Sequence, residues 1–144
     1  MITVNQILQR KGHQYFSVAP DSITYDALKL MAEKEIGAVL VIQNDRIVGI
    51  LSERDYARKI VLKGKSSKNT KVSELMSSTV YAVNGSTTLD ECMHLMTDRR
   101  IRHLPVVEED KIIGVLSIGD IVNCVIQEQK RTIEQLENYI ITGQ

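Results

Sequence analysis

Two copies of one short motif hold the side chains best suited to chemistry in this sequence. The segments GILSERD (49–55) and GVLSIGD (114–120) share the pattern Gly-h-h-Ser-x-x-Asp, in which h is apolar. We expect each motif to leave a strand and begin a helix. A helix N-terminus offers unpaired N–H groups and positive potential to a phosphate, and a carboxylate can accept paired hydrogen bonds from a ribose diol. These residue types are therefore compatible with a nucleotide site.

The same motif also has a purely structural interpretation. Serine is a favoured N-cap, and an acidic residue three positions later completes a capping box and suits the helix dipole. Capping does not explain the repeated glycine, because glycine weakens a strand and often marks the close approach of a ligand or of another backbone. Residue chemistry alone leaves both interpretations open.

The densest basic cluster is RRIRH (99–103), directly before Leu104 and Pro105. Cations are favoured near helix C-termini, so we interpret Arg99 and Arg100 as a solvated helix end. For Arg102 and His103 the cluster alone leaves open whether they belong to the same solvated end or contact a ligand. Pro105 has no backbone N–H to donate to a β-ladder. Its strand is therefore either an edge strand or one whose backbone faces a ligand at that position.

The sequence contains an internal duplication. Aligning 18–55 with 83–120 at an offset of 65 makes eleven of 38 residues identical, among them Gly49/Gly114, Ser52/Ser117 and Asp55/Asp120. Before these segments the offset becomes 68, because VNQIL (4–8) matches VSELM (72–76). Two homologous units therefore follow one another along the chain.

Each unit has the order strand, helix, strand, strand, helix. Runs of β-forming residues predict strands at 16–19 and 80–83, and helices should follow with Ser22 and Thr87 as N-caps. Two hairpins should then form, one from 38–42 and 47–51 and the other from 104–107 and 112–116. The polar, Ser/Lys-rich stretch 63–71 is typical of a solvated linker.

Both units resemble CBS (cystathionine β-synthase) domains in element order, in the core segments IGAVLV and IRHLPV, and in the Gly-h-h-Ser-x-x-Asp exit. The resemblance covers positions 4–124. It implies an α+β fold of two pseudo-symmetric β-α-β-β-α repeats packed sheet to sheet, a Bateman module, extended by a C-terminal helix. We assign repeat 1 to 1–62, a linker to 63–71, repeat 2 to 72–127 and a helical tail to 128–144.

The family's two clefts receive adenosyl ligands such as AMP, ADP, ATP, NAD or S-adenosylmethionine, with no required cofactor. The resemblance implies that Asp55 and Asp120 hold ribose hydroxyls and that Ser52 and Ser117 lie by the ribose or phosphate. Arg54 either reaches a phosphate or pairs with a nearby acid. The implied adenine pockets comprise Ser17, Gly37, Ala38 and Val39 in site one, and Thr79, Ala82, His103, Leu104 and Pro105 in site two. Because Arg102-His103 replaces Gly37-Ala38, we expect site two to suit a phosphorylated ligand.

Composition narrows the function further. The 18 Lys and Arg balance 18 Asp and Glu, so the chain as a whole gives no electrostatic reason to bind nucleic acid or an anionic membrane. We found no membrane-length apolar run and no signal-peptide pattern, and we expect a cytoplasmic location. Cys92 and Cys124 lack metal or redox spacing and should be buried. No metal site is expected.

The segment 118–141 carries Val122, Val125, Ile133, Leu136 and Ile140 at helical spacing, interrupted by Gln129. This surplus amphipathic helix either clasps a second copy in a homodimer or folds back onto its own module.

Three classes of function follow. The first is a regulatory nucleotide sensor that acts as a homodimer on a separate, unidentified partner. The second is a dimerisation scaffold that binds no ligand. The third and weakest is an enzyme, since the sequence lacks a nucleophile elbow, Walker loop, HExxH or dinucleotide fingerprint, and we assign no catalytic residue.

Overall fold

The computed structural model describes residues 1–143, which form two compact units. Unit 1 contains Met1–His13 and the chain from Val83 onward, and unit 2 contains Gln14–Ala82. The units do not coincide with the sequence repeats, because the N-terminal segment of each repeat belongs to the compact unit of the other. The observed α+β architecture, with two repeats and a C-terminal helix, agrees with the predicted fold class. Sheet-to-sheet packing stays a prediction.

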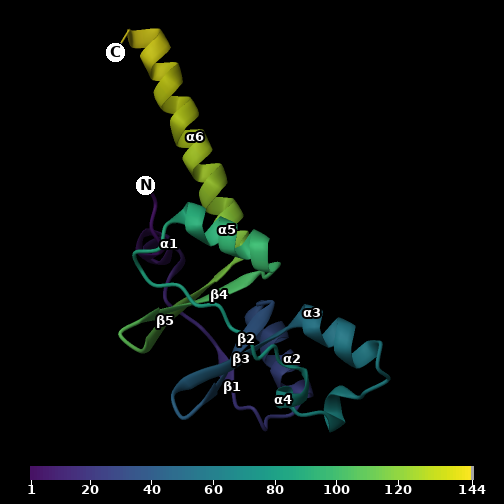
Figure 1. Ribbon diagram of the computed structural model, residues 1–144. Coiled ribbons are helices and arrows are strands. Elements are labelled where there is room, and N and C mark those ends of the chain that lie inside the picture. Colours follow the sequence, from purple (N-terminus) through teal and green to yellow (C-terminus); the bar gives the residue numbers. More distant parts are fainter. Residues whose placement is uncertain (144) are drawn as a thin grey trace. The chain divides into compact units, whose positions relative to one another are not determined.

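Unit 2 is built around a three-stranded sheet (Figure 1). Its central strand β2 (Ala38–Gln43) pairs in parallel with β1 (Ser17–Val18) and antiparallel with β3 (Arg46–Ser52). The helices are α2 (Thr24–Lys34), α3 (Glu53–Tyr56), which continues as a π-helical turn over Ala57–Val61, a 3-10 turn at Ser67–Asn69, and α4 (Val72–Leu75). Apolar side chains of the sheet and of these helices form one core, which comprises Ala27, Met31, Val39, Val41, Leu51, Ile60, Val72 and Leu75.

Unit 1 repeats this plan with fewer strands. It contains α1 (Val4–Lys11), α5 (Leu89–Arg99), a hairpin of β4 (His103–Glu108) and β5 (Lys111–Ser117), and the long helix α6 (Ile118–Thr142). The two hairpins match in register, in the position of their β-bulge and in their turns. Asn44 and Asp45 both have positive φ, as do Glu109 and Asp110, which is the conformation that a tight two-residue hairpin turn requires. Both predicted hairpins are confirmed.

The prediction of a strand at 80–83 is wrong. In unit 2 the Leu40 N–H donates to the Phe16 carbonyl at 3.0 Å, which helps to pair β1 with β2. Pro105 occupies the position of Leu40 in the duplication and has no N–H to donate. Segment 80–83 therefore makes a single parallel bridge, between Val83 and Val106. Pro105 thus lies in a strand that is largely an edge on that side.

The predicted N-caps were misplaced by one residue. Helix α5 is capped by Thr88, whose Oγ1 accepts from the Glu91 N–H at 3.2 Å, and Ile23 occupies the equivalent position before α2. The hydroxyls of Ser22 and Thr87 instead accept from the N–H groups of Ala19 and Asn84, at 3.1 and 3.2 Å. Both residues stabilise the turn before the helix.

The short helices α1 and α4 are exchanged between the repeats. In unit 1 the Val4 N–H donates to Thr87 O and the Asn5 N–H donates to Gly85 O, at 2.8 and 2.9 Å. Unit 2 has the same pair of bonds. There the N–H groups of Val72 and Ser73 donate to Ser22 O and Pro20 O, again at 2.8 and 2.9 Å. The segment that precedes each repeat in sequence therefore completes the unit that contains the other repeat's hairpin.

This exchange explains the repeated glycine. A Cβ on Gly49 would lie 2.5 Å from Met76 Sδ and 2.9 Å from Ser77 O, and a Cβ on Gly114 would lie 2.8 Å from Leu8 Cδ2. Leu8 and Met76 are equivalent residues at the offset of 68. Each glycine lets a residue of an exchanged helical segment pack onto the strand, so the atoms closest to each glycine belong to the protein itself.

The C-terminal segment does not fold back onto unit 1. Helix α6 is continuous over 25 residues, and residues 129–143 are all exposed. Figure 1 shows it projecting well beyond α1, α5 and the hairpin of its own unit. Over residues 1–143, no helix combines the length and apolarity needed to cross a membrane.

Gly49→Ala should lower the free energy of unfolding by about 1–3 kcal/mol, because the new methyl group meets the Ser77 carbonyl, which cannot rotate away. Gly119→Ala is the matched control. Its Cβ would lie 3.5 Å from Ser117 Oγ, and alanine is the better helix former. Urea unfolding followed by circular dichroism measures both. Equal stability of Gly49→Ala and wild type would contradict the packing explanation.

Candidate functional site

In unit 2 the Ser-x-x-Asp motif forms the predicted capping box. The Asp55 N–H donates to Ser52 Oγ at 3.1 Å, while Asp55 Oδ2 accepts from the Ser52 N–H and hydroxyl at 3.1 and 3.0 Å. Lys59 Nζ lies 3.6 Å from Asp55 Oδ1 and also donates to Leu75 O. The Asp55 carboxylate is thus engaged at both oxygens by its own helix and its N-cap.

In unit 1 the motif forms the same box, but its cation comes from a different element. Asp120 Oδ2 accepts from the Ser117 N–H at 2.7 Å, and Asp120 N–H donates to Ser117 Oγ at 3.2 Å. Lys11, the last residue of α1, places Nζ 2.6 Å from Asp120 Oδ2 and also donates to Val115 O. The exchanged helix therefore supplies the counter-ion of this carboxylate.

Each motif is also joined to the start of the preceding strand. The Glu53 N–H donates to Gly37 O at 3.0 Å, and the Ile118 N–H donates to Arg102 O at 2.8 Å. Ala38 pairs with Ser52 across the hairpin, as His103 pairs with Ser117. The structure therefore brings together the predicted strand residues and the Ser of each motif, and it makes Gly37-Ala38 and Arg102-His103 structural equivalents.

The remaining predicted site residues differ in what they can offer a ligand. Val39, Leu104 and Pro105 are buried, and Val39 belongs to the core of unit 2, so these residues present mainly backbone atoms. The side chains of Ser17, Arg54, Thr79, Ala82 and Arg102 are exposed. Thr79 and Ala82 belong to unit 2, whereas the other residues predicted for site two belong to unit 1. Arg99 ends α5 and Arg100 is its left-handed C-cap, as a helix end requires.

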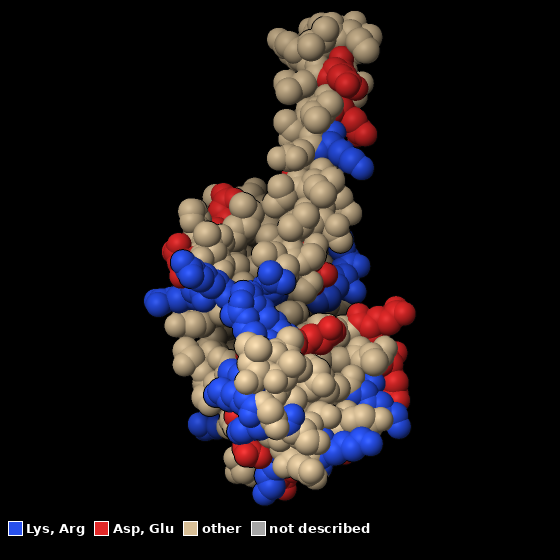
Figure 2. Space-filling model, turned by 90° about the vertical axis from the view of Figure 1, so that its right-hand side faces the viewer, with Lys and Arg blue, Asp and Glu red and all other residues tan. Residues whose placement is uncertain are grey.

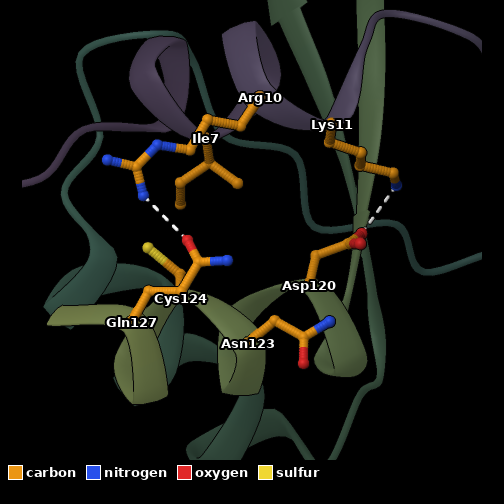
Figure 3. A pocket seen from close by; sticks show the side chains of 7 residues that line it. All are labelled: Ile7, Arg10, Lys11, Asp120, Asn123, Cys124 and Gln127. Carbon is orange, nitrogen blue, oxygen red and sulfur yellow. Dashed lines mark hydrogen bonds and ion pairs between the residues drawn. The ribbon is translucent and has the colours of Figure 1, made fainter. Parts of the chain in front are cut away.

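A pocket of about 230 Å³ opens beside Asp120 in unit 1 (Figure 3). Helix α1 forms one wall and the first turns of α6 form the other, and the lining comprises Ile7, Arg10, Lys11, Asp120, Asn123, Cys124 and Gln127. Arg10 Nη1 donates to Gln127 Oε1 at 2.9 Å across the pocket. Two cations, two amides and one carboxylate therefore meet in one small space.

Sequence reasoning missed the α1 wall of this pocket. Arg10 and Lys11 lie in repeat 1 but before the aligned segment 18–55, and nothing local marks Lys11 as the partner of Asp120, 109 positions later. The signal was the offset of 68, which aligns Lys11 with Thr79, a residue already predicted to line a site. Extending that alignment by three residues beyond Leu8 would have identified Lys11.

Both thiols are poor nucleophiles. Burial, aided by the nearby Glu91 carboxylate, raises the pKa of Cys92 to about 11 from 9.0. Burial also raises the pKa of Cys124, opposed by Arg10 and reinforced by Glu128. Both thiols therefore stay protonated at neutral pH. Within residues 1–143 no group of three His, Cys, Asp or Glu side chains is arranged to hold a metal ion.

Comparison with known proteins identifies the family. The sequence model of the CBS domain matches residues 4–62 and 72–127. A solved protein with CBS domains from Burkholderia ambifaria MC40-6 is 52% identical, with a TM-score of 0.84 over 88% of this chain and 96% of that chain. The mitochondrial CBS domain-containing protein CBSX3 of Arabidopsis thaliana is 37% identical over 98% of this chain and 73% of its own length. The chain belongs to the CBS domain family.

A more distant solved structure extends the likeness of fold. The CBS domain pair of protein MJ0100, in complex with 5′-methylthioadenosine and S-adenosyl-L-methionine, has a TM-score of 0.79 at 19% identity, covering 89% of this chain and 98% of that one. At this identity the likeness concerns the fold alone.

Cys92 and Cys124 should resist thiol reagents in the folded protein at pH 7.5. A pKa of about 11 leaves roughly a hundredfold less thiolate than a pKa of 9.0, and both side chains are buried. Ellman's reagent should therefore label both only after unfolding in urea. Asn138→Cys, at an exposed position of α6, is the control that should react at once. Rapid labelling of the native wild type would contradict this assignment.

Proposed function

We propose that this chain is a regulatory module that binds an adenosine nucleotide. The observation that carries the proposal is the pocket of unit 1, where Asp120 of the repeated motif lies beside Arg10 and Lys11. A carboxylate suits the ribose diol, and two cations suit phosphate oxygens. In the same unit His103 begins β4 and pairs with Ser117, and Arg102 directly precedes it.

The volume of the pocket fits part of a nucleotide. Ligand pockets usually measure about 300–1,000 Å³, and this pocket measures about 230 Å³. It has room for a phosphate with part of its ribose, so the base would lie outside it. We propose that the base contacts backbone at the start of β4, where Leu104 and Pro105 bury their side chains.

The two motifs should differ in ligand preference. In unit 2, Gly37-Ala38 replaces Arg102-His103, and the cation that pairs with the carboxylate of Asp55 is Lys59, from its own helical segment. The cationic side chains assigned to the two sites are Arg10, Lys11 and Arg102 in unit 1, and Arg54 and Lys59 in unit 2. We therefore propose that the site of Asp120 takes the phosphorylated ligand and that the site of Asp55 is the weaker one.

The adenosyl class of ligand has support from the fold. The CBS pair of MJ0100 holds two adenosyl compounds on the same architecture. AMP, ADP, ATP, NAD and S-adenosylmethionine all share the adenosine group, and the cations of unit 1 favour those with phosphates. We further propose that the module is cytoplasmic, needs no cofactor, catalyses no reaction, and acts as a homodimer on a separate protein.

One alternative has specific support. Capping accounts for Ser52, Asp55, Ser117 and Asp120, and helix packing accounts for both glycines of the motif. A dimerisation scaffold without a ligand would contain the same features. The two functions differ in one measurable respect, which is whether any adenosine compound binds.

Asp120→Ala should abolish binding of AMP or ATP at the site of unit 1 in isothermal titration calorimetry, and Asp55→Ala should abolish the weaker event. Asp110→Asn is the control, because asparagine tolerates the left-handed turn conformation and the site keeps its carboxylate. Wild type should also gain thermal stability by about 2.7 kcal/mol at a hundredfold excess of ligand over Kd. Absence of heat and of any thermal shift with all five ligands would establish the scaffold instead.

Lys11→Met should weaken AMP or ATP binding about tenfold while leaving unphosphorylated adenosine unaffected or tighter. The ion pair at 2.6 Å must open when a ribose takes Asp120, and the freed ammonium then has the phosphate as its partner. A hydrogen bond to a charged group contributes about 1.5–3 kcal/mol. Lys130→Met, on the exposed part of α6, controls for the loss of one positive charge. Equal loss of AMP and adenosine affinity would contradict a phosphate contact.

A further inference from the structure

Helix α6 carries a second apolar stripe that unit 1 does not cover. Ile121 and Cys124 pack into the core, with 3% and 6% of their surfaces exposed. A separate set of large apolar side chains stays 44–79% exposed, namely Ile118, Val122, Ile126, Ile133, Leu136 and Ile140. The helix therefore has one face that folds the unit and another that lacks a partner within residues 1–143.

The exposed side chains form one continuous stripe. At about 100° per residue, all six fall within roughly 80° of one another around the helix axis. Three of them lie where α6 packs on unit 1, and three lie on the projecting part. Ile126, at 44% exposure, takes the place that the sequence pattern suggested for Val125, which is half-buried.

The spacing of the stripe is that of a coiled coil. From Val122 the steps to Ile126, Gln129, Ile133, Leu136 and Ile140 are 4, 3, 4, 3 and 4 residues. In this heptad the a positions hold Ile126, Ile133 and Ile140, and the d positions hold Val122, Gln129 and Leu136. β-branched residues at a with leucine at d favour a parallel two-stranded coiled coil.

Gln129 indicates what the partner is. It occupies a d position in an otherwise apolar stripe, where an apolar partner would leave its amide without hydrogen bonds. In a parallel, in-register pair of identical helices, each layer meets its own copy, so two Gln129 amides can donate to and accept from each other. In coiled coils a single polar core residue, such as asparagine at an a position, specifies register and the number of strands, and we assign that role to Gln129.

The charged side chains of α6 lie outside the apolar stripe. Glu128, Arg131 and Glu134 occupy outer positions of the heptad, and Glu128 and Arg131 lie 3.4 Å apart as a local ion pair. Lys130 and Glu137 take e positions at the edge. In Figure 2 the charged groups on the projecting helix gather on one side, and its remaining visible surface is uncharged.

We propose that α6 pairs with α6 of a second copy as a parallel, in-register coiled coil, with Gln129 as its polar layer. An exposed helix end of this length is marginal alone in water, and the coiled coil would bury its apolar side chains. The stripe thereby becomes the interface of the homodimer proposed above. The inference rests on that homodimer and is independent of nucleotide binding.

Leu136→Cys tests the polarity of the pair in the full chain. Parallel in-register helices bring the two 136 positions face to face, at a separation that a disulfide can bridge. Mild oxidation should therefore convert Leu136→Cys to a covalent dimer. Gln135→Cys, at the neighbouring c position outside the a and d positions of the interface, should stay unlinked. Cys92 and Cys124 are buried and do not compete. Failure of Leu136→Cys to link, or equal linking of both variants, overturns the proposal.

The double variant Ile133→Asp/Leu136→Asp tests the energetics. Sedimentation equilibrium should show a dimer dissociation constant at least a hundredfold above that of wild type, while Asn138→Asp should leave it unchanged. Circular dichroism and the AMP thermal shift should persist in the double variant, because the substituted residues are exposed and distant from Asp120 in sequence. A monomeric wild type, or a dissociation constant within twofold of wild type in the double variant, refutes the pairing whether or not AMP binds.

Discussion

The exchange of short helices between repeats is the constraint on which the rest of the structure depends. Helix α1 completes the unit of the second hairpin, and α4 completes the unit of the first, through equivalent backbone hydrogen bonds. Neither sequence repeat therefore contains all of its own unit. The strand glycines follow from this arrangement, because a side chain at Gly49 would displace Met76, the C-cap of α4, and a side chain at Gly114 would displace Leu8 of α1. Each of the two duplicated repeats therefore needs a short helix from the other repeat to complete its unit.

The exchange also determines what surrounds each motif carboxylate. Asp55 meets a lysine four residues along its own helical segment, whereas Asp120 meets a lysine from the exchanged helix. Both carboxylates are already satisfied by capping and by a cation, so a ribose must compete with these contacts for them. The difference between the two sites therefore lies in how far a ligand must disturb the fold. At Asp120, the proposed ligand would have to displace the contact with Lys11, which joins α1 to the first turn of α6.

Repeated local signals predicted most of the fold, and the failures have physical causes. The hairpins, their turns and the capping boxes depend on residues adjacent in sequence, and these predictions were confirmed. The prediction of a strand at 80–83 failed because the strand it would pair with has Pro105 where unit 2 has Leu40. The missing N–H donor is therefore on the opposite strand, not in segment 80–83 itself. The N-caps failed by one residue because Ser22 and Thr87 bond to the preceding turn. Lys11 was missed because the exchange of α1 is a tertiary event, visible in the sequence only as the change of offset from 65 to 68.

Helix α6 joins the candidate ligand site to the candidate dimer interface. Asp120 lies in its first turn, while Ile118 and Val122 of the exposed stripe lie on either side of that residue. A ligand can shift an assembly equilibrium only if it binds the two states with different affinity. Such a difference requires that binding change the position or order of α6, and opening the Lys11–Asp120 ion pair acts on its first turn. Coupling of this kind is reciprocal, so a ligand at Asp120 would act on the second copy only to the extent that dimerisation in turn alters the affinity for the ligand. The proposed regulatory function thus requires no contact between the proposed ligand and the partner chain.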